Sequence, residues 1–268
     1  MDNRPIGMFD SGVGGITIYK EVREKLPMED IIYLGDTKRF PYGSKSKESI
    51  INLTKNGIEF LLRKNVKAVI IACGTATSQA LEEVKKLYNI PIIGIIEPTV
   101  NYISSNKKIK KIGVVATSGT IKSNCWETSL LKVRPDLKII NKACPLLAPM
   151  AEEGWTDNEI AKLTVHEYMK DVHDVDSLIL GCTHYPLFME LFKNEVRKDT
   201  EIINTGNVIA DYLEKMFSSK EAKSFEKNTC KEDKSQIYLT DIECNFVNVA
   251  QRLLGKNKQD IHTFLAKI

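Results

Sequence analysis

Two of the six cysteines occupy matching places in the sequence. Cys73 follows the apolar run 68–72 and Cys182 follows the run 178–180, at an offset of 109 residues. Each has a threonine within two residues, Thr75 and Thr183. A single cysteine at a strand end is usually a small buried hydrophobe. Two at matched positions instead predict two thiols that face each other across one cleft, where one sulfur takes a proton from a carbon and the other returns a proton to the opposite face.

Racemisation of an α-amino acid needs such a pair, because a base must act on one face of Cα and an acid on the other. A thiol has an ordinary pKa of about 8.5, so nearby charges and hydrogen bonds must poise one sulfur as thiolate. His184 stands two residues after Cys182, and Asp10 ends the first predicted strand. Both are candidates for this task. Glu152 has the sequence context of a surface carboxylate.

Two loops are candidates for substrate binding. Residues 10–15, Asp-Ser-Gly-Val-Gly-Gly, form a glycine-rich turn between a predicted strand and a predicted helix, which aims backbone N–H groups at an anion. A dinucleotide fingerprint would need glycine where Thr17 stands, so the predicted anion is a carboxylate. Residues 36–44 follow the second predicted strand and could bind the other end of the substrate, although this segment alone is typical of an ordinary loop.

Short apolar runs alternate with longer amphipathic segments, which is typical of parallel sheets with crossover helices. Strands are predicted at residues 6–9, 31–34, 68–72, 92–95, 112–115, 138–140, 178–180, 202–203 and 236–239. Helices are predicted at residues 16–26, 48–63, 77–87, 121–131, 158–169, 208–217 and 246–254. The Ser-, Lys- and Glu-rich segment 218–236 is predicted to be an exposed connection.

A weak internal repeat organises these segments. Residues 6–12 resemble 112–119, residues 69–75 resemble 178–183, and Ile92-Ile93 resembles Ile202-Ile203, all at offsets of 106 to 110. We therefore expect an α/β protein with two similar α/β domains related by a pseudo-two-fold axis, mostly parallel sheets, and an active site in the interdomain cleft. The expected domains are residues 1–97 plus 207–268, and residues 98–206.

Composition excludes several classes of function. The net charge of +3 arises from 38 basic and 35 acidic residues, which is too balanced to predict nucleic-acid binding. The N-terminal residues lack the pattern of a signal peptide, and no apolar run is long enough for a membrane span. We expect a cytoplasmic protein without a membrane partner. The cysteines form no C-x-x-C pair, and the remaining ones are expected to be structural.

At four segments the sequence resembles the glutamate racemases of the aspartate/glutamate racemase superfamily. These segments run from residue 9 to residue 187 and keep the order and spacing of the family: Phe9-Asp10-Ser11-Gly12-Val13-Gly14-Gly15, Leu34-Gly35-Asp36 with Pro41-Tyr42-Gly43, Ala72-Cys73-Gly74-Thr75-Ala76, and Gly181-Cys182-Thr183-His184-Tyr185-Pro186-Leu187. The Asp-Ser-Gly and Cys-Thr-His versions are similar to the glutamate branch rather than the aspartate branch.

The resemblance implies interconversion of L- and D-glutamate by two bases, without pyridoxal phosphate or metal. By this resemblance Cys73 would deprotonate D-glutamate with support from Asp10, and Cys182 would deprotonate L-glutamate with support from His184 and Glu152. Substrate contacts would come from Asp10, Ser11, Tyr42, Gly43, Gly74, Thr75, Thr183 and His184. The implied role is supply of D-glutamate for bacterial peptidoglycan, and the implied assembly is a homodimer.

One position departs from the family pattern, which more usually has Asn after the first cysteine where this chain has Gly74. The departure bears on substrate affinity more than on the type of reaction. Three other interpretations remain open at this point: a racemase of aspartate or another amino acid, a thiol redox protein that cycles Cys73 and Cys182 through a disulfide, and an amino-acid binder without activity.

Overall fold

The computed structural model describes residues 2–217, 234–242, 245–254 and 263–268. Within them the strands form two sheets in which every neighbouring pair is parallel. The first sheet has the order β10-β9-β2-β1-β3-β4, with β1 Ile6–Asp10, β2 Ile31–Gly35, β3 Ala68–Ile71, β4 Ile92–Gly94, β9 Gln236–Leu239 and β10 Thr263–Leu265. The second has the order β6-β5-β7-β8, with β5 Lys111–Ala116, β6 Lys138–Ala143, β7 Ser177–Leu180 and β8 Glu201–Asn204.

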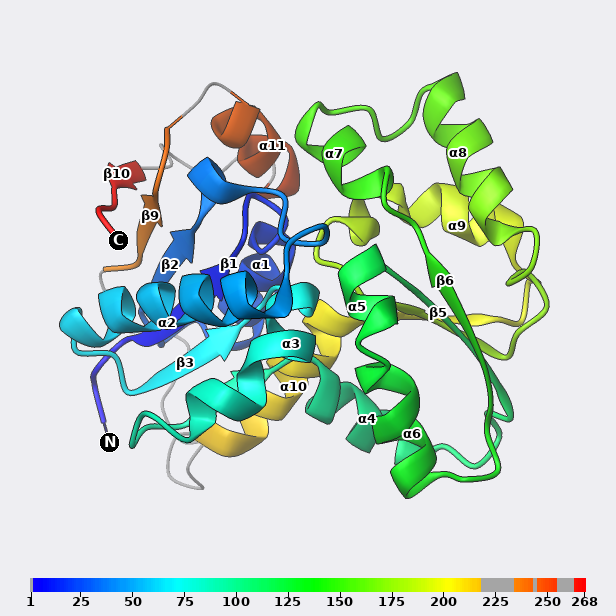
Figure 1. The fold of residues 1–268 in the computed structure, drawn as a ribbon, viewed down its shortest axis with the longest axis horizontal. Helices are drawn as coiled ribbons and strands as arrows, with labels where there is room; N and C mark the ends of the chain where they lie inside the picture. Colours follow the sequence, from blue (N-terminus) through cyan, green and yellow to red (C-terminus); the bar gives the residue numbers. More distant parts are fainter. Residues whose placement is uncertain (1, 218–233, 243–244, 255–262) are drawn as a thin grey trace.

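The same strand order occurs in both sheets, which confirms the predicted α/β class and the repeat. The order β2-β1-β3-β4 in the first sheet corresponds to β6-β5-β7-β8 in the second. Figure 1 shows the two sheets in two lobes that lie side by side. We call the part built on the first sheet the first lobe and the part built on the second sheet the second lobe. The exact domain boundaries, 1–97 plus 207–268 and 98–206, stay a prediction, to which the pairing of β9 with β2 lends support.

Helices cover the faces of both sheets and fill the space between the lobes (Figure 1). Their bounds are α1 Ile16–Lys25, α2 Lys47–Arg63, α3 Gly74–Lys85, α4 Ile96–Ser105, α5 Ser118–Lys122, α6 Cys125–Val133, α7 Leu147–Glu152, α8 Glu159–Met169, α9 Met189–Glu195, α10 Thr205–Phe217 and α11 Asn245–Leu254. Strands β1, β3, β5 and β7 are buried along almost their whole length, as expected for parallel strands covered on both faces. One apolar cluster continues from Ile6 and Ile70 to Ile112 and Ile179, and thus joins the two sheets.

One predicted helix was wrong and another helix was missed. The helix expected at residues 121–131 is two helices, α5 and α6, because Asn124 between them adopts left-handed backbone angles with φ 55°. Helix α4 was not predicted, and it contains Pro98. Pro98 lies in the first turn, where its missing N–H would have no helical partner in any case.

Other elements were also missed or shifted. The short helices α7 and α9 and the edge strand β10 were not predicted, and α3 begins at Gly74, three residues before its predicted start. The part of the predicted connection 218–236 that covers residues 218–233 lies outside the described residues. Across the described residues, every helix is too short or too polar to cross a membrane.

Candidate active site

Both sheets direct the carboxyl ends of their central strands towards one cavity between the lobes. Ligands of open parallel sheets bind at this edge, where a strand gives way to a loop and a helix. The cavity has a volume of about 100 Å³. Its lining residues are Ser11, Phe40, Pro41, Tyr42, Gly43, Ser44, Cys73, Gly74, Thr75, Thr117, Ser118, Pro145, Ala148, Pro149, Cys182, Thr183 and His184. A cavity therefore lies between the lobes, as predicted, and Cys73 and Cys182 both lie in its wall.

Cys73 comes from the first lobe. It follows β3 and stands at the N-cap position of α3, with 5% of its surface exposed. Its thiol donates a hydrogen bond to Ser11 Oγ at 3.4 Å. Burial and the charge of Asp10 raise the pKa of the Cys73 thiol to about 12, although its hydrogen bonds with Ser11 and with the backbone of Ala76 oppose the change. A pKa this high favours the protonated thiol at neutral pH.

Cys182 comes from the second lobe, two residues after β7, and is also almost fully buried. Its Sγ lies 3.7 Å from His184 Nδ1, and His184 Nε2 lies 2.7 Å from Glu152 Oε1. Burial alone lowers the pKa of His184, but the hydrogen bonds to Cys182 and Glu152 and the Glu152 charge outweigh it and raise that pKa well above its ordinary value. The protonated ring places a positive charge beside Cys182. The two thiols thus lie in opposite electrostatic environments.

Glu152 is a central residue of the site and not the isolated surface carboxylate that its sequence context suggested. It ends the short helix α7 and has a side chain only 21% exposed. Its Oε1 accepts hydrogen bonds from His184 and, at 3.1 Å, from the backbone N–H of Val13 in the first lobe. The glycine-rich loop was predicted to bind an anion, and the backbone N–H of Val13 in this loop binds the carboxylate of Glu152. Hydrogen bonds to charged groups contribute about 1.5–3 kcal/mol each.

Asp10 lies behind the cavity wall. It is fully buried and accepts hydrogen bonds from the backbone of Gly12 at 3.0 Å and from Thr183 Oγ1 at 3.3 Å. Burial raises the pKa of Asp10 to about 6, while the neighbouring His184 charge and the backbone donors lower it. Among the residues predicted to contact substrate, Asp10 does not line the cavity, whereas the other seven do.

The loop at residues 36–44 is fixed by a buried carboxylate. Asp36 accepts hydrogen bonds from Tyr42 Oη at 2.6 Å and from Thr240 Oγ1 at 2.7 Å, and pairs with Arg39 at 2.7 Å. Burial and the Asp36 charge raise the Tyr42 pKa above its ordinary value. Since the hydroxyl is engaged with Asp36, Tyr42 presents its ring and the adjoining backbone to the cavity.

Sequence reasoning missed a group of hydroxyls from the second lobe. Thr117 Oγ1 lies 2.8 Å from Thr75 Oγ1 and 3.0 Å from Thr120 Oγ1, so the threonines join α3 to α5 across the cavity. Thr117 and Ser118 also line the cavity. The internal repeat contained the signal, because residue 117 is the counterpart of Ser11 at an offset of 106.

Gly74 allows the two cysteine loops to approach each other. A Cβ atom on residue 74 would lie 2.2 Å from the backbone oxygen of Gly181, which directly precedes Cys182. With this backbone, the position therefore has no room for the side chain of the Asn that the family more usually has. In the described residues no group of three His, Cys, Asp or Glu side chains is placed to hold a metal ion.

We expect Gly74→Ala to destabilise the protein by about 1–3 kcal/mol, because the added methyl group can be accommodated only if backbone moves. Urea unfolding measures the change. Gly206→Ala is the control, since the nearest atoms to a Cβ there lie at 3.2 Å and belong to side chains. Equal free energies of unfolding for the two variants would contradict this expectation, because they would show that the lobes can move apart at residue 74 without cost.

We expect Glu152→Gln to lower the pKa of His184, because the variant loses the carboxylate that stabilises the imidazolium. The raised pKa implies that this interaction stabilises the fold fully below about pH 6.5, the ordinary histidine value, and that the contribution disappears as pH rises through the folded-state pKa. NMR titration of ring-labelled protein, which has four histidines, measures the pKa. The neighbouring exposed residue provides the control Glu153→Gln, and an equal effect of both variants would contradict the assignment.

Comparisons with known proteins agree with this geometry. The sequence model of the Asp/Glu/Hydantoin racemase family matches residues 15–213. A glutamate racemase of Sulfurihydrogenibium sp. is 42% identical over 259 residues, which cover 96% of both chains. One from Geobacter metallireducens is 35% identical over 261 residues, 97% of this chain and 96% of the relative.

A solved structure gives the same result. The crystal structure of glutamate racemase from Francisella tularensis in complex with D-glutamate superimposes with a TM-score of 0.88 at 34% identity, covering 100% of this chain and 98% of that one. The matched residues include both cysteine loops and the histidine–glutamate pair. The chain belongs to the aspartate/glutamate racemase family.

Proposed function

We propose that this protein interconverts L-glutamate and D-glutamate with two thiols and no cofactor. The observation that carries the proposal is the pair of buried cysteines from repeated positions, which line one cavity from opposite lobes. The substrate follows from the relatives, which are named glutamate racemases, and from the related structure that holds D-glutamate.

The two environments suggest a direction for each thiol. With L-glutamate bound, Cys182 as thiolate takes the proton from Cα, and the electron pair moves towards the substrate carboxylate. The Cys73 thiol then donates its proton to the opposite face of Cα, which yields D-glutamate and leaves Cys73 as thiolate. The raised pKa of Cys73 supports its role as the acid in this direction. D-glutamate follows the reverse path, with Cys73 as base and Cys182 as acid.

Hydroxyls and backbone N–H groups are proposed to hold the substrate. Ser11, Thr75 and Thr183 line the cavity, and Gly74 begins α3, whose free N–H groups attract a carboxylate. Thr75 and Thr117, which bind each other at 2.8 Å, can both turn towards a substrate carboxylate. Asp10 and Glu152 act from behind this layer, through Thr183 and His184 respectively.

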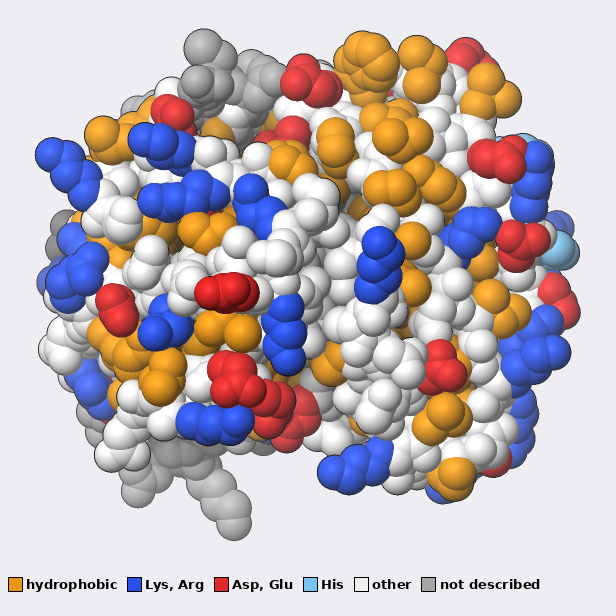
Figure 2. Space-filling model, in the orientation of Figure 1, with side chains coloured by type: hydrophobic (Ala, Val, Ile, Leu, Met, Phe, Trp, Pro, Cys, Tyr) orange, Lys and Arg blue, Asp and Glu red, His pale blue; other side chains and the backbone are white. Residues whose placement is uncertain are grey.

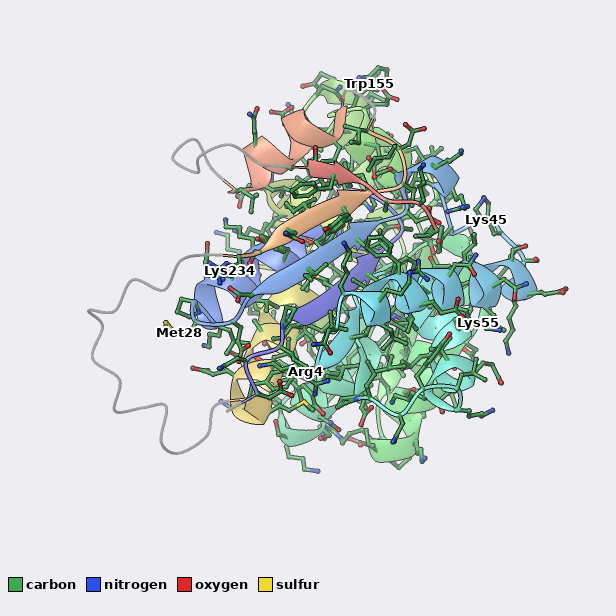
Figure 3. The ribbon with its side chains drawn as sticks, turned by 90° about the vertical axis from the view of Figure 1, so that its left-hand side faces the viewer. Arg4, Met28, Lys45, Lys55, Trp155 and Lys234 are labelled. Carbon is green, nitrogen blue, oxygen red and sulfur yellow. The ribbon has the colours of Figure 1, made fainter. Side chains whose placement is uncertain are left out.

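The cellular role and the assembly are further proposals. We infer that the D-glutamate serves peptidoglycan synthesis in the cytoplasm, and that the protein is a homodimer. Exposed apolar side chains gather over α7 and α8 (Figure 2), where Leu146, Trp155, Ile160 and Leu163 are 47–68% exposed. Trp155 stands at one end of the molecule (Figure 3). An apolar surface of this kind supports association of two copies. Light scattering tests this by comparing the molecular mass of the Leu163→Glu variant with that of the unchanged protein.

In D₂O, we expect dialysed protein without added cofactor to convert L-glutamate into D-glutamate that carries deuterium at Cα. The label arises because the returning proton comes from a thiol that exchanges with solvent. Chiral chromatography with mass spectrometry measures both features, and L-aspartate is the control substrate. Activity that requires added pyridoxal phosphate or metal would contradict the cofactor-free mechanism, and faster conversion of aspartate would contradict the assigned substrate.

We expect Cys73→Ser and Cys182→Ser each to lower the racemisation rate by about 10²- to 10⁴-fold, because a hydroxyl is a far weaker base than a thiol near neutral pH. Cys125→Ser is the matched control, since Cys125 is half-buried on α6 and does not line the cavity. Circular dichroism measured in duplicate verifies folding. Near-normal turnover in either of the first two variants would refute the paired-thiol mechanism.

A further inference from the structure

A second hollow lies beside the catalytic cavity. It has a volume of about 340 Å³ and is lined by Lys45, Lys47, Ser78, Gln79, Gly119, Lys122 and Ser123. Pockets that bind small ligands usually start at about 300 Å³. None of these residues lines the catalytic cavity, so the hollow is a separate feature of the surface.

Both lobes contribute to the hollow. Lys45 and Lys47 lie just before and at the start of α2, and Figure 3 shows Lys45 beside that end of the helix. Lys122 ends α5 of the second lobe. Between them, the backbone N–H of Gly119 donates to the backbone oxygen of Gly43 at 2.9 Å. Gly43 lines the catalytic cavity and Gly119 lines the hollow, so this hydrogen bond separates the two.

The hollow has an excess of positive charge. In the part of the chain that the structure describes, Lys45, Lys47 and Lys122 form no salt bridge. Acidic side chains on the adjoining helices, Glu48 on α2 and Glu82 on α3, are not among its lining residues. Three ammonium groups around one concave surface repel each other and attract anions.

Among the uncharged residues that line the hollow, one side chain can donate a hydrogen bond to a ligand. The hydroxyls of Ser78 and Ser123 donate to backbone oxygens of their own helices, at 3.1 and 2.6 Å. The Gln79 amide makes no side-chain hydrogen bond to any described residue, and its Nε2 would lie 2.8 Å from a Cβ on Gly119. Because residue 119 is glycine, the amide has free space beside it and can donate to a ligand.

We propose that this hollow binds a small polyanion, a molecule with two or more phosphate or carboxylate groups, that joins the lobes at the rim of the catalytic cavity. One anionic group pairs with Lys45 and Lys47 and the other with Lys122, with Gln79 as the neutral donor. The bound anion removes the repulsion between the lysines. It also restrains residues 42–44, which precede Lys45 directly and line the catalytic cavity.

Isothermal titration calorimetry with inorganic pyrophosphate at low ionic strength tests the site, and orthophosphate and sodium chloride of matched ionic strength serve as comparison solutes. We expect saturable binding of pyrophosphate. Lys122→Ala should weaken it about fivefold, and Lys45→Ala combined with Lys122→Ala more than about tenfold. Lys132→Ala is the control, because Lys132 is exposed on α6 and lies outside the hollow.

Four outcomes decide the proposal without reference to turnover. Binding that persists with saturating D-glutamate supports a separate site, whereas its loss would place the anion in the catalytic cavity and overturn the proposal. Absence of saturable binding would also overturn it, as would equal affinity of the Lys122→Ala and Lys132→Ala variants. Because the lysine side chains are on the surface, melting curves without anion should be unchanged, which separates loss of binding from loss of folding.

Discussion

Glu152 joins the two lobes beside the cavity, because its single carboxylate accepts hydrogen bonds from His184 of its own lobe and from the backbone N–H of Val13 in the other. Together with Cys182, this carboxylate raises the pKa of His184, and it also holds the glycine-rich loop against the second lobe. A Cβ on Gly14 would lie 2.4 Å from His184 Nδ1, so the approach is possible only for glycine. Thr17, which donates to the backbone oxygen of Thr183 at 2.9 Å, holds the same two loops together. The same carboxylate therefore contributes both to the charge balance of the cavity wall and to the packing of the two lobes.

The repeated architecture brings similar loops together, but their surroundings differ in charge. Cys73 has a hydroxyl and a buried carboxylate nearby, whereas Cys182 has an imidazolium. The difference lies in the residues around each sulfur and not in the strand order, which is the same in both sheets. The internal repeat places the two thiols in the wall of one cavity, and the substitutions between the two copies give them different charged neighbours.

The sequence predicted features that depend on local pattern and on the repeat. Strand positions followed from apolar runs, and Cys73 and Cys182 followed from matched positions. Features that depend on long-range contacts could not be read in this way. The partners of Glu152 are 139 and 32 residues distant, and nothing in residues 147–153 indicates them. The break at Asn124 depends on a single left-handed residue, for which a helical pattern gives no warning. The position of Thr117 in the cavity wall was predictable from the repeat, because Thr117 is the counterpart of Ser11.

The pairing of β2 with β9 has a consequence for synthesis on the ribosome. Strand β2 appears within the first 35 residues, but its outer neighbour arrives only with residues 236–239. Until then the edge of a nearly complete sheet presents unpaired N–H and C=O groups, while the second lobe can already form from contiguous chain. Such an edge is a template for pairing with another nascent chain. The chain order thus makes the first lobe the vulnerable one during translation, although it contains the earliest residues to emerge.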